Sequence, residues 1–204
     1  MHTLAYLTAA SMLVGCTPAG ESSNDIGAYQ DNGTTMDNPV ANPTGDVSPD
    51  TDAVAAPTDA PGYLAAAAAG DLWEIRSSQA LLARSKRADV RAFAQMMVTE
   101  HQQSTAKLAD VASAENISAA AAVLNTDQQG MLAEIENAAP DQIDAVYLRH
   151  QRAAHALALA THRAYADGGD NAALKKAASA MVPVVQRHIA RIDELSRAVP
   201  AVGG

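Results

Sequence analysis

The sequence has only one cysteine among its 204 residues, Cys16, so no internal disulfide can form. Aromatic residues make up 3% of the chain, and a folded core must therefore be built mainly from Ala, Leu, Val and Met. Neither an alternating strand pattern nor a glycine-rich phosphate loop is present. These features favour an all-helical protein held together by close packing of small and aliphatic side chains.

Lysine and arginine are missing from residues 17–61, although eight acidic residues lie there. The formal net charge of the chain is −9, so the residues outside this stretch sum to only −1 and carry no large basic field. Nucleic acid is therefore not an expected partner. The same stretch has few large apolar side chains and cannot bury enough surface to offset the entropy lost on folding, so we expect residues 17–61 to be a disordered acidic linker.

Cys16 follows a short run of apolar and small residues, LAYLTAASMLVG. The tetrapeptide LVGC that ends at Cys16 resembles a lipobox, the site at which bacteria attach lipid to an exported protein. The alternatives are an ordinary cleaved signal with a chance cysteine, or no signal at all. Because the chain turns polar directly afterwards, we interpret residues 1–16 as a lipoprotein-type signal. Its leading part offers only His2 where basic residues are usual, which leaves open that the true start codon lies upstream.

A lipid on Cys16 would anchor the protein to a membrane, because the apolar run before it is too short to span a bilayer. The expected location is the periplasmic side of the cell envelope. By resemblance to bacterial sorting rules, Thr17 in place of Asp favours the outer membrane over the inner one. The sequence identifies no protein partner.

From residue 62 onward the composition changes to Ala, Leu, Val and Met with interspersed charges. Periodicity and capping residues predict four long helices and one short one, at about residues 63–84, 89–114, 126–137, 140–168 and 170–198. The first and last links between long helices are short, whereas the middle link is long enough to cross over. We therefore predict that residues 62–204 form an all-α, ferritin-like antiparallel four-helix bundle whose one long crossover contains the short helix.

Several residues mark where these helices begin. Pro140 suits a first helical position, Asp170 suits an N-cap, and Thr126 with Gln129 could form a capping box.

Two features concern the interiors of the helices. Pro183 removes one hydrogen bond from the last helix and is expected to kink it, either as a tolerated defect or to position the histidine five residues later. The core-facing stripe of the first helix is expected to contain Leu64, Ala68, Ile75 and Leu82.

Three of the long helices carry histidines in step with apolar residues. His101 shares a stripe with Phe93, Met97 and Leu108. His188 shares one with Met181, Val184, Ile192 and Leu195. His155 and His162 lie on one face with Leu148 and Leu159, while His150, flanked by arginines, is expected to be exposed. Counting residues from the hairpin turns places Glu74, His101, His155 and His188 in one broad layer.

Three converging histidines have two interpretations. They cannot all be charged in a dry core, so they are either neutral and hydrogen-bonded or bound to a metal ion. No cofactor is certain from the sequence. A metal site would use His101, His155 and His188, with His162 as an additional candidate, and imidazole ligands suit Zn, Cu or Fe equally.

The carboxylates argue against a ferritin-type di-iron centre. Such a centre needs two Glu-x-x-His motifs and two further glutamates, and no Glu in this chain precedes a His by three positions. Glu100, another additional candidate, is adjacent to His101 and points about 100° away from it. Glu74 is either a fourth metal ligand or a solvated charge at the rim of the bundle, and we expect the rim charge.

Four features together resemble the domain of unknown function 4142 family, exported bacterial proteins with a ferritin-like bundle. They are Glu74, the run VRAFAQMMVTEH ending at His101, Tyr147 eight residues before His155, and LKKAASAMVPVVQRH ending at His188. The resemblance covers residues 63–197 and implies that the three histidines face inward. Glu100 stands where the family usually has Asp, and His162 stands at a position that tends to be aromatic or apolar, which suggests a core-facing site. The resemblance implies no activity.

The sequence as a whole favours a lipid-anchored periplasmic helical bundle with a structural or binding role, and not an enzyme. The alternative is a metal-binding ferritin-like protein in metal handling or stress response. A di-iron oxidase is the least favoured reading, because the Glu-x-x-His pairs are missing.

Overall fold

The structure, a computed structural model, describes residues 56–199, and every regular element in that part is a helix. The predicted signal, its Cys16 and the linker up to residue 55 lie outside the described residues. The helices are α1 (Ala60–Arg84), α2 (Ala88–Ala114), α3 (Thr126–Asn137), α4 (Ile143–Gly168) and α5 (Ala172–Ala198).

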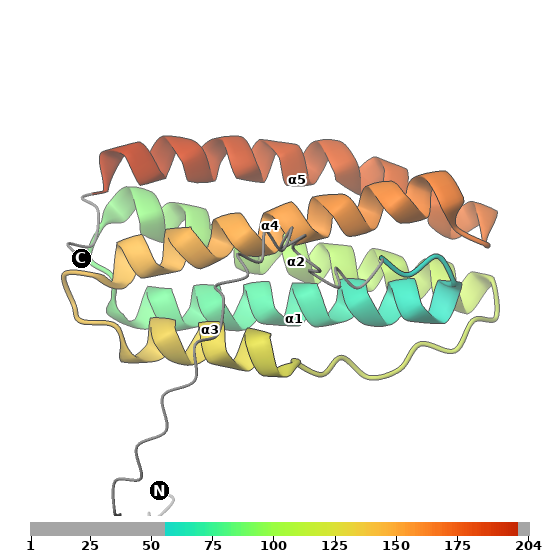
Figure 1. Ribbon diagram of the computed structural model, residues 1–204, viewed down its shortest axis with the longest axis horizontal. Helices are drawn as coiled ribbons and strands as arrows, with labels where there is room; N and C mark the ends of the chain where they lie inside the picture. The colour runs from blue at the N-terminus through green and yellow to red at the C-terminus, as the bar shows by residue number, and fades with distance from the viewer. Residues whose placement is uncertain (1–55, 200–204) are drawn as a thin grey trace, which may run out of the picture. The chain divides into compact units, whose positions relative to one another are not determined.

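The four long helices form two antiparallel hairpins, α1–α2 and α4–α5, each closed by a short turn (Figure 1). A crossover of residues 115–142 joins the two hairpins and runs back along the bundle. It contains α3, which packs on α1 and α4. Helix α1 lies beside α2 and α4, and α5 lies beside α4 and α2. The predicted ferritin-like four-helix bundle with one crossover is confirmed.

Two helices begin three residues away from their predicted starts, and the other starts differ by at most two residues. Helix α1 begins three residues early, at Ala60, because the Asp59 side chain accepts a hydrogen bond from the backbone N–H of Gly62 at 2.8 Å. Helix α4 begins at Ile143, because the residues from Pro140 to Gln142 form a turn before it. Pro183 lies inside α5, which continues on both sides of it.

Two predicted caps are each wrong by one residue. The capping box of α3 is made by Asn125 and Gln128, and α5 is capped by Asn171, whose side chain accepts from the backbone N–H of Leu174 at 2.9 Å. Asp170 instead accepts a hydrogen bond from the Tyr165 hydroxyl. Asn and Asp are nearly equal N-cap residues, so Asp170 and Asn171 cannot be ranked from propensity, whereas Asn125 is a better N-cap residue than Thr126.

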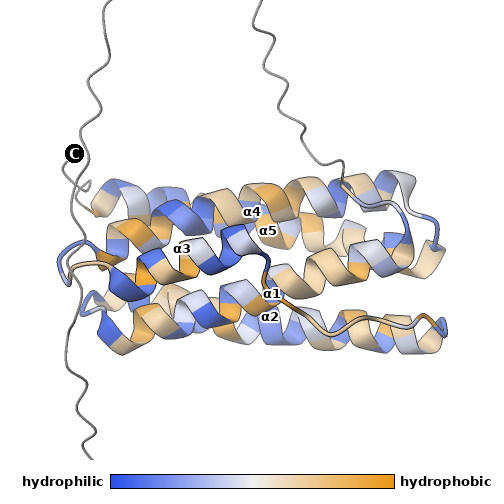
Figure 2. Cartoon of the chain, turned by 60° about the horizontal axis from the view of Figure 1, so that its bottom comes forward, coloured by the Kyte–Doolittle hydropathy of each residue, from blue (hydrophilic) through white to orange (hydrophobic). Residues whose placement is uncertain are grey.

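The core consists of two apolar clusters near the two ends of the bundle, with buried polar residues between them along the long helices. Figure 2 shows that every long helix carries both hydrophobic and hydrophilic residues. One cluster includes Trp73, Leu81, Phe93, Met97, Tyr147 and Ile192. The other includes Tyr63, Leu64, Leu108, Tyr165, Leu174 and Ala178.

The buried face of α1 is more polar than the predicted stripe. Of that stripe only Leu64 is buried, and Ala68, Ile75 and Leu82 are partly exposed. The residues that are buried on α1 after Ala67 are the polar Asp71, Glu74, Ser77 and Ser78 and the apolar Trp73 and Leu81. The four polar residues are at helical spacing, so the central part of α1 presents oxygen atoms to α2 and α4. On α5, Val185 is buried in place of the predicted Val184.

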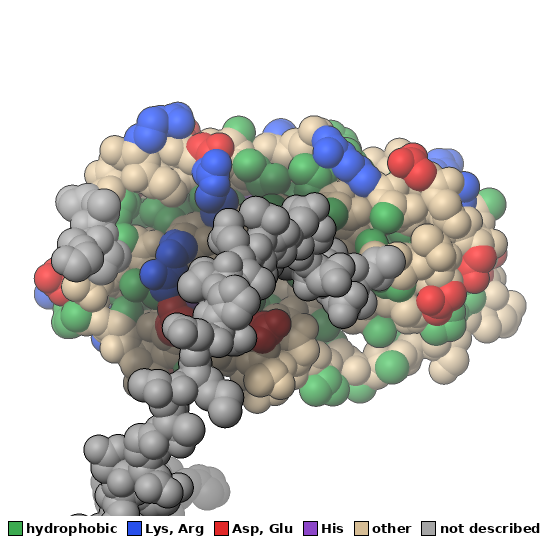
Figure 3. Space-filling model, in the orientation of Figure 1, with side chains coloured by type: hydrophobic (Ala, Val, Ile, Leu, Met, Phe, Trp, Pro, Cys, Tyr) green, Lys and Arg blue, Asp and Glu red, His purple; other side chains and the backbone are tan. Residues whose placement is uncertain are grey.

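The surface of the bundle is mixed in charge. Figure 3 shows Lys and Arg side chains interspersed with Asp and Glu on the face that it draws. Within residues 56–199 no helix has the length and apolar character needed to cross a membrane.

Candidate metal centre

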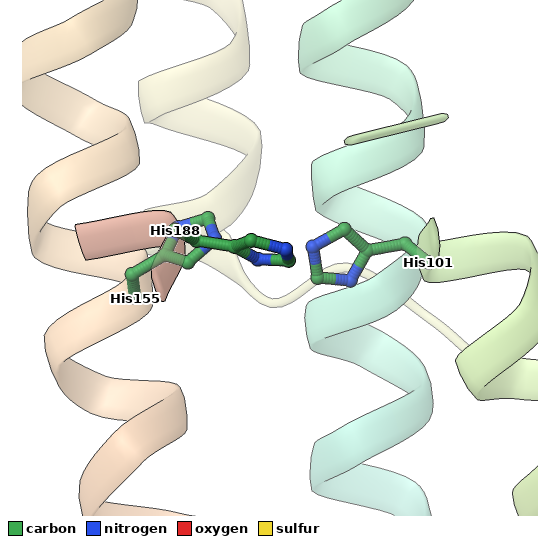
Figure 4. Close-up of side chains that lie close together, drawn as sticks. All are labelled: His101, His155 and His188. Carbon is green, nitrogen blue, oxygen red and sulfur yellow. The ribbon is translucent and has the colours of Figure 1, made fainter. Parts of the chain in front are cut away.

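Three histidines from three helices meet at the centre of the bundle: His101 from α2, His155 from α4 and His188 from α5. Their rings point toward one another (Figure 4). Each ring offers one nitrogen, and these three nitrogens all lie within 4.8 Å of one another. The ring centroids are 5.2 to 5.8 Å apart. The predicted convergence of the three histidines is therefore confirmed, with His155 and His188 buried and His101 partly buried.

Each ring is held by an oxygen acceptor on the nitrogen that faces away from the other rings. His101 Nδ1 lies 2.7 Å from Asp71 Oδ1. His155 Nδ1 lies 2.9 Å from the backbone oxygen of Gln151 and 3.2 Å from Glu74 Oε1. The same role is filled for His188 by Glu100, whose Oε2 lies 2.8 Å from Nε2.

These contacts fix which nitrogens carry protons. A carboxylate or carbonyl oxygen only accepts, so the outer nitrogen of each ring must be an N–H. In a neutral ring the remaining nitrogen then holds a lone pair, and these nitrogens are His101 Nε2, His155 Nε2 and His188 Nδ1. His101 Nε2 is buried without a hydrogen-bond partner, and the other two lie 3.2 Å apart. Two lone pairs at that distance repel each other unless a proton or a metal ion lies between them.

The charges around the rings are unevenly balanced. Burial lowers the pKa of His188 to about 4, although the Glu100 hydrogen bond opposes this effect. Burial also acts to lower the pKa of His101, but the hydrogen bond to Asp71 and the charge of Glu74 outweigh it and raise the pKa. The pKa of Glu74 is lowered despite complete burial, because the charge and hydrogen bond of His155 favour the carboxylate.

Glu74 is not the solvated rim charge that we expected, because its residue is only 3% exposed. Its Oε1 orients His155, and its Oε2 is buried with no hydrogen-bond partner. Glu100 does not join His101 and instead contacts His188 on the neighbouring helix α5. Within the described residues, the group of nitrogens close enough to share one ion comprises the three histidines.

The other histidines lie outside this group. His162 faces the core as expected, but its Nδ1 pairs with the Tyr63 hydroxyl at 3.0 Å. Burial lowers the pKa of His162, so the ring is neutral near neutral pH. His150 is buried rather than exposed, because it reaches Glu134 of the crossover helix with Nε2 at 2.9 Å. Its position between two arginines indicated an exposed face of α4. The prediction was wrong because α3 covers that face.

Asp71 is the site residue that the sequence analysis missed. It holds His101 through Oδ1 and accepts from the Thr105 hydroxyl through Oδ2 at 3.0 Å. A signal for it exists in the sequence, because Asp71 and Glu74 are three residues apart in an otherwise alanine-rich run. Two carboxylates at helical spacing share a face, and that face could have been matched with the histidine layer.

The comparisons with known proteins agree with this fold. Residues 46–195 match the family described as Domain of unknown function (DUF4142). The chain belongs to this family. A similar solved structure is the crystal structure of a DUF305 fragment from Deinococcus radiodurans, with a TM-score of 0.62 and 12% identity over 71% of this chain and 99% of that one. At that identity the likeness concerns the fold alone. No curated protein matches the chain.

Proposed function

We propose that this DUF4142 protein binds one divalent transition-metal ion through His101, His155 and His188. The observation that carries the proposal is the set of three inward nitrogens within 4.8 Å of one another, each on a ring whose outer nitrogen is already held by an oxygen acceptor. Histidine ligands of metals commonly donate their other N–H in this way, which fixes the tautomer and raises the basicity of the ligand.

The distances suit a metal after a small contraction. With metal–nitrogen bonds of about 2.0–2.1 Å, two nitrogens at tetrahedral positions lie about 3.3 Å apart. His155 Nε2 and His188 Nδ1 are already 3.2 Å apart. The nitrogens of the group need to approach by no more than about 1.5 Å to reach that spacing from their upper limit of 4.8 Å.

The local charge also favours a cation. Asp71 and Glu74 are buried, and Glu100 is partly buried against His188. With neutral imidazoles, these three carboxylates leave a net negative charge inside the bundle, where unpaired charge is costly. A divalent ion at the inner nitrogens offsets that negative charge and lowers the free-energy cost of burying the carboxylates.

The competing structural role is a hydrogen-bonded core without metal. One extra proton between His155 and His188 would relieve the contact between their facing nitrogens. That proton leaves His101 Nε2 buried without a partner, whether His101 is neutral or protonated. A metal ion satisfies all three nitrogens at once, and this difference favours the metal site.

The proposed role is metal handling or a response to metal stress, and not catalysis. Three imidazoles suit Zn, Cu or Fe, and the fourth tetrahedral position falls to water, because Glu74 contacts the outer nitrogen of His155 and is not part of the group. The rigid placement of the ligands on three long helices supports binding more than turnover.

Metal retention tests the proposal. Residues 56–204 are dialysed separately against Zn²⁺, Cu²⁺ and anaerobic Fe²⁺, desalted, and assayed for bound metal beside the variant His101→Ala/His155→Ala/His188→Ala. We expect about one ion per chain for the wild type with at least one metal and almost none for the triple variant. Equal retention by both proteins, or no retention by either, would remove the proposal. His162→Ala, which lies outside the group, serves as the matched control and should keep its metal.

We also propose that the bundle is held on the periplasmic side of the outer membrane by a lipid on Cys16. Support comes from the lipobox-like LVGC and the polar stretch that follows it. In cells that express the full chain, wild-type protein should fractionate with membranes and Cys16→Ser should become soluble. Membrane association that survives this substitution would show that another feature anchors the protein.

A further inference from the structure

A groove between α2 and α5 opens beside the histidines. It has a volume of about 350 Å³, and its walls include Ala92, Phe93, Met96 and Glu100 from α2 and Arg187 and His188 from α5. A second cavity of similar volume, about 340 Å³, lies under the crossover and includes Leu72, Val123 and Leu132. The second cavity contains no residue of the three-histidine group. Of the two cavities, the α2–α5 groove is therefore the one that adjoins the metal centre.

His188 forms part of both the groove and the centre. Its Nδ1 faces His155 inside the bundle, and its Nε2 faces Glu100 at the groove. The side chain of Glu100 is 37% exposed, while that of His188 is 4% exposed. The contact between these two side chains therefore separates solvent in the groove from the inner nitrogens.

The charges in the groove suit the capture of a cation at one place. Glu100 is the acidic residue among the groove walls. Arg191, another groove residue, is paired with Glu194 at 2.6 Å, and Arg187 donates to the backbone oxygen of Pro183 at 3.2 Å. Six waters at about 30 Å³ each occupy about 180 Å³, so a hydrated ion fits in the groove.

We propose that divalent metal ions enter and leave the three-histidine centre through this groove, and that Glu100 is the first protein ligand they meet. The proposal rests on the metal binding proposed above. An arriving ion exchanges a bound water for a Glu100 oxygen, and His188 then loses the acceptor that fixes its ring. The ring can turn, and the ion passes to the inner nitrogens while further waters leave. Apart from the His188–Glu100 hydrogen bond, only metal–ligand bonds are formed or broken.

Binding kinetics test the route, with Co²⁺ as the probe because its visible absorption reports nitrogen coordination. Ala92 is exposed at the groove, so Ala92→Trp should fold normally and narrow the opening. We expect the association and dissociation rate constants for Co²⁺ to fall together by about tenfold or more, with the dissociation constant changed less than about threefold. A tryptophan in the groove raises the free-energy barrier to metal entry and exit but does not change the free energy of the metal-free or the metal-bound protein. Val123→Trp, at the other cavity and 72% exposed, should leave both rates unchanged.

Glu100→Gln supplies the second test, because it keeps the shape of the side chain and removes its charge. The association rate constant should fall by about tenfold and lose most of its dependence on ionic strength. If Co²⁺ binds the wild type but both rate constants are unchanged in Ala92→Trp, the groove is not the route. The same conclusion follows if Ala92→Trp raises the dissociation constant for Co²⁺ and leaves the association rate constant unchanged. If Co²⁺, Zn²⁺ and Cu²⁺ all fail to bind the wild type, the metal proposal itself fails, and the route with it.

Discussion

Replacing His155 with leucine is expected to lower the unfolding free energy of the metal-free protein by about 3–5 kcal/mol, because it leaves a buried charge without a partner. Glu74 Oε1 lies 3.2 Å from His155 Nδ1, and both side chains are at most 4% exposed. His155 is also the main reason that the pKa of Glu74 is lowered despite burial. A loss of this size is a large part of the roughly 5–15 kcal/mol by which most domains are stable.

Urea unfolding in the presence of a chelator measures this effect. The double variant Glu74→Gln/His155→Leu removes the charge together with its partner, and it should recover at least about 1 kcal/mol relative to the single variant. Leu157→Ala, on the same helix at a position 68% exposed, is the control and should change stability by less than about 0.5 kcal/mol. A loss below about 1 kcal/mol for His155→Leu, or no recovery in the double variant, would contradict a charged and buried Glu74.

Asp71→Asn is expected to weaken metal binding by about 10–100-fold while leaving all three histidines in place. The Asp71 carboxylate accepts from His101 Nδ1 at 2.7 Å and thereby fixes the tautomer that turns Nε2 inward. An amide oxygen is a weaker acceptor, and the amide can also turn its NH₂ group toward the ring. Isothermal titration with the metal retained in dialysis measures the loss. Thr105→Val removes only the second partner of Asp71 and should cost less.

The same variant should change how stability depends on pH in the metal-free protein. Burial, the largest single effect, acts to lower the pKa of His101, but the Asp71 hydrogen bond and the charges of the nearby carboxylates together outweigh it and raise the pKa above its ordinary 6.5. A raised pKa in the folded state means that the contribution of His101 is fully present below pH 6.5 and is lost as the pH rises through the raised value. In Asp71→Asn the pKa of His101 should be raised less, so the unfolding free energy should fall less as the pH rises. An unchanged pH profile from urea unfolding between about pH 6 and 9 would contradict the role assigned to Asp71.

The helices and their order could be predicted because each signal is local. Alanine-rich periodic segments, turn residues and short links define two hairpins, and a long link between hairpins leaves a crossover as the simple solution. Errors in the helix bounds were confined to helix ends, where two neighbouring residues can both act as caps, as Asp170 and Asn171 can before α5. The convergence of His101, His155 and His188 followed from the same reasoning, because apolar stripes place a residue on a face and residue counts place it at a height.

The acceptors around the histidines could not be predicted in the same way. A stripe of apolar residues reports which face is buried only where the buried residues are apolar, and the central face of α1 is polar. Glu74 was therefore expected at the rim, and Asp71 went unnoticed. The Glu100–His188 contact joins residues 88 positions apart, so it depends on how α2 packs against α5 and leaves no trace in local spacing.

X-ray absorption at the metal edge of protein loaded with about one ion per chain tests the central claim most directly. The account predicts a first shell of nitrogen or oxygen atoms at about 2.0–2.1 Å for zinc, with the outer-shell scattering of three imidazole rings. It also predicts that this scattering weakens by one ring in His101→Ala. A shell of about six oxygens without imidazole scattering, or a spectrum that His101→Ala leaves unchanged, would contradict metal binding at His101, His155 and His188.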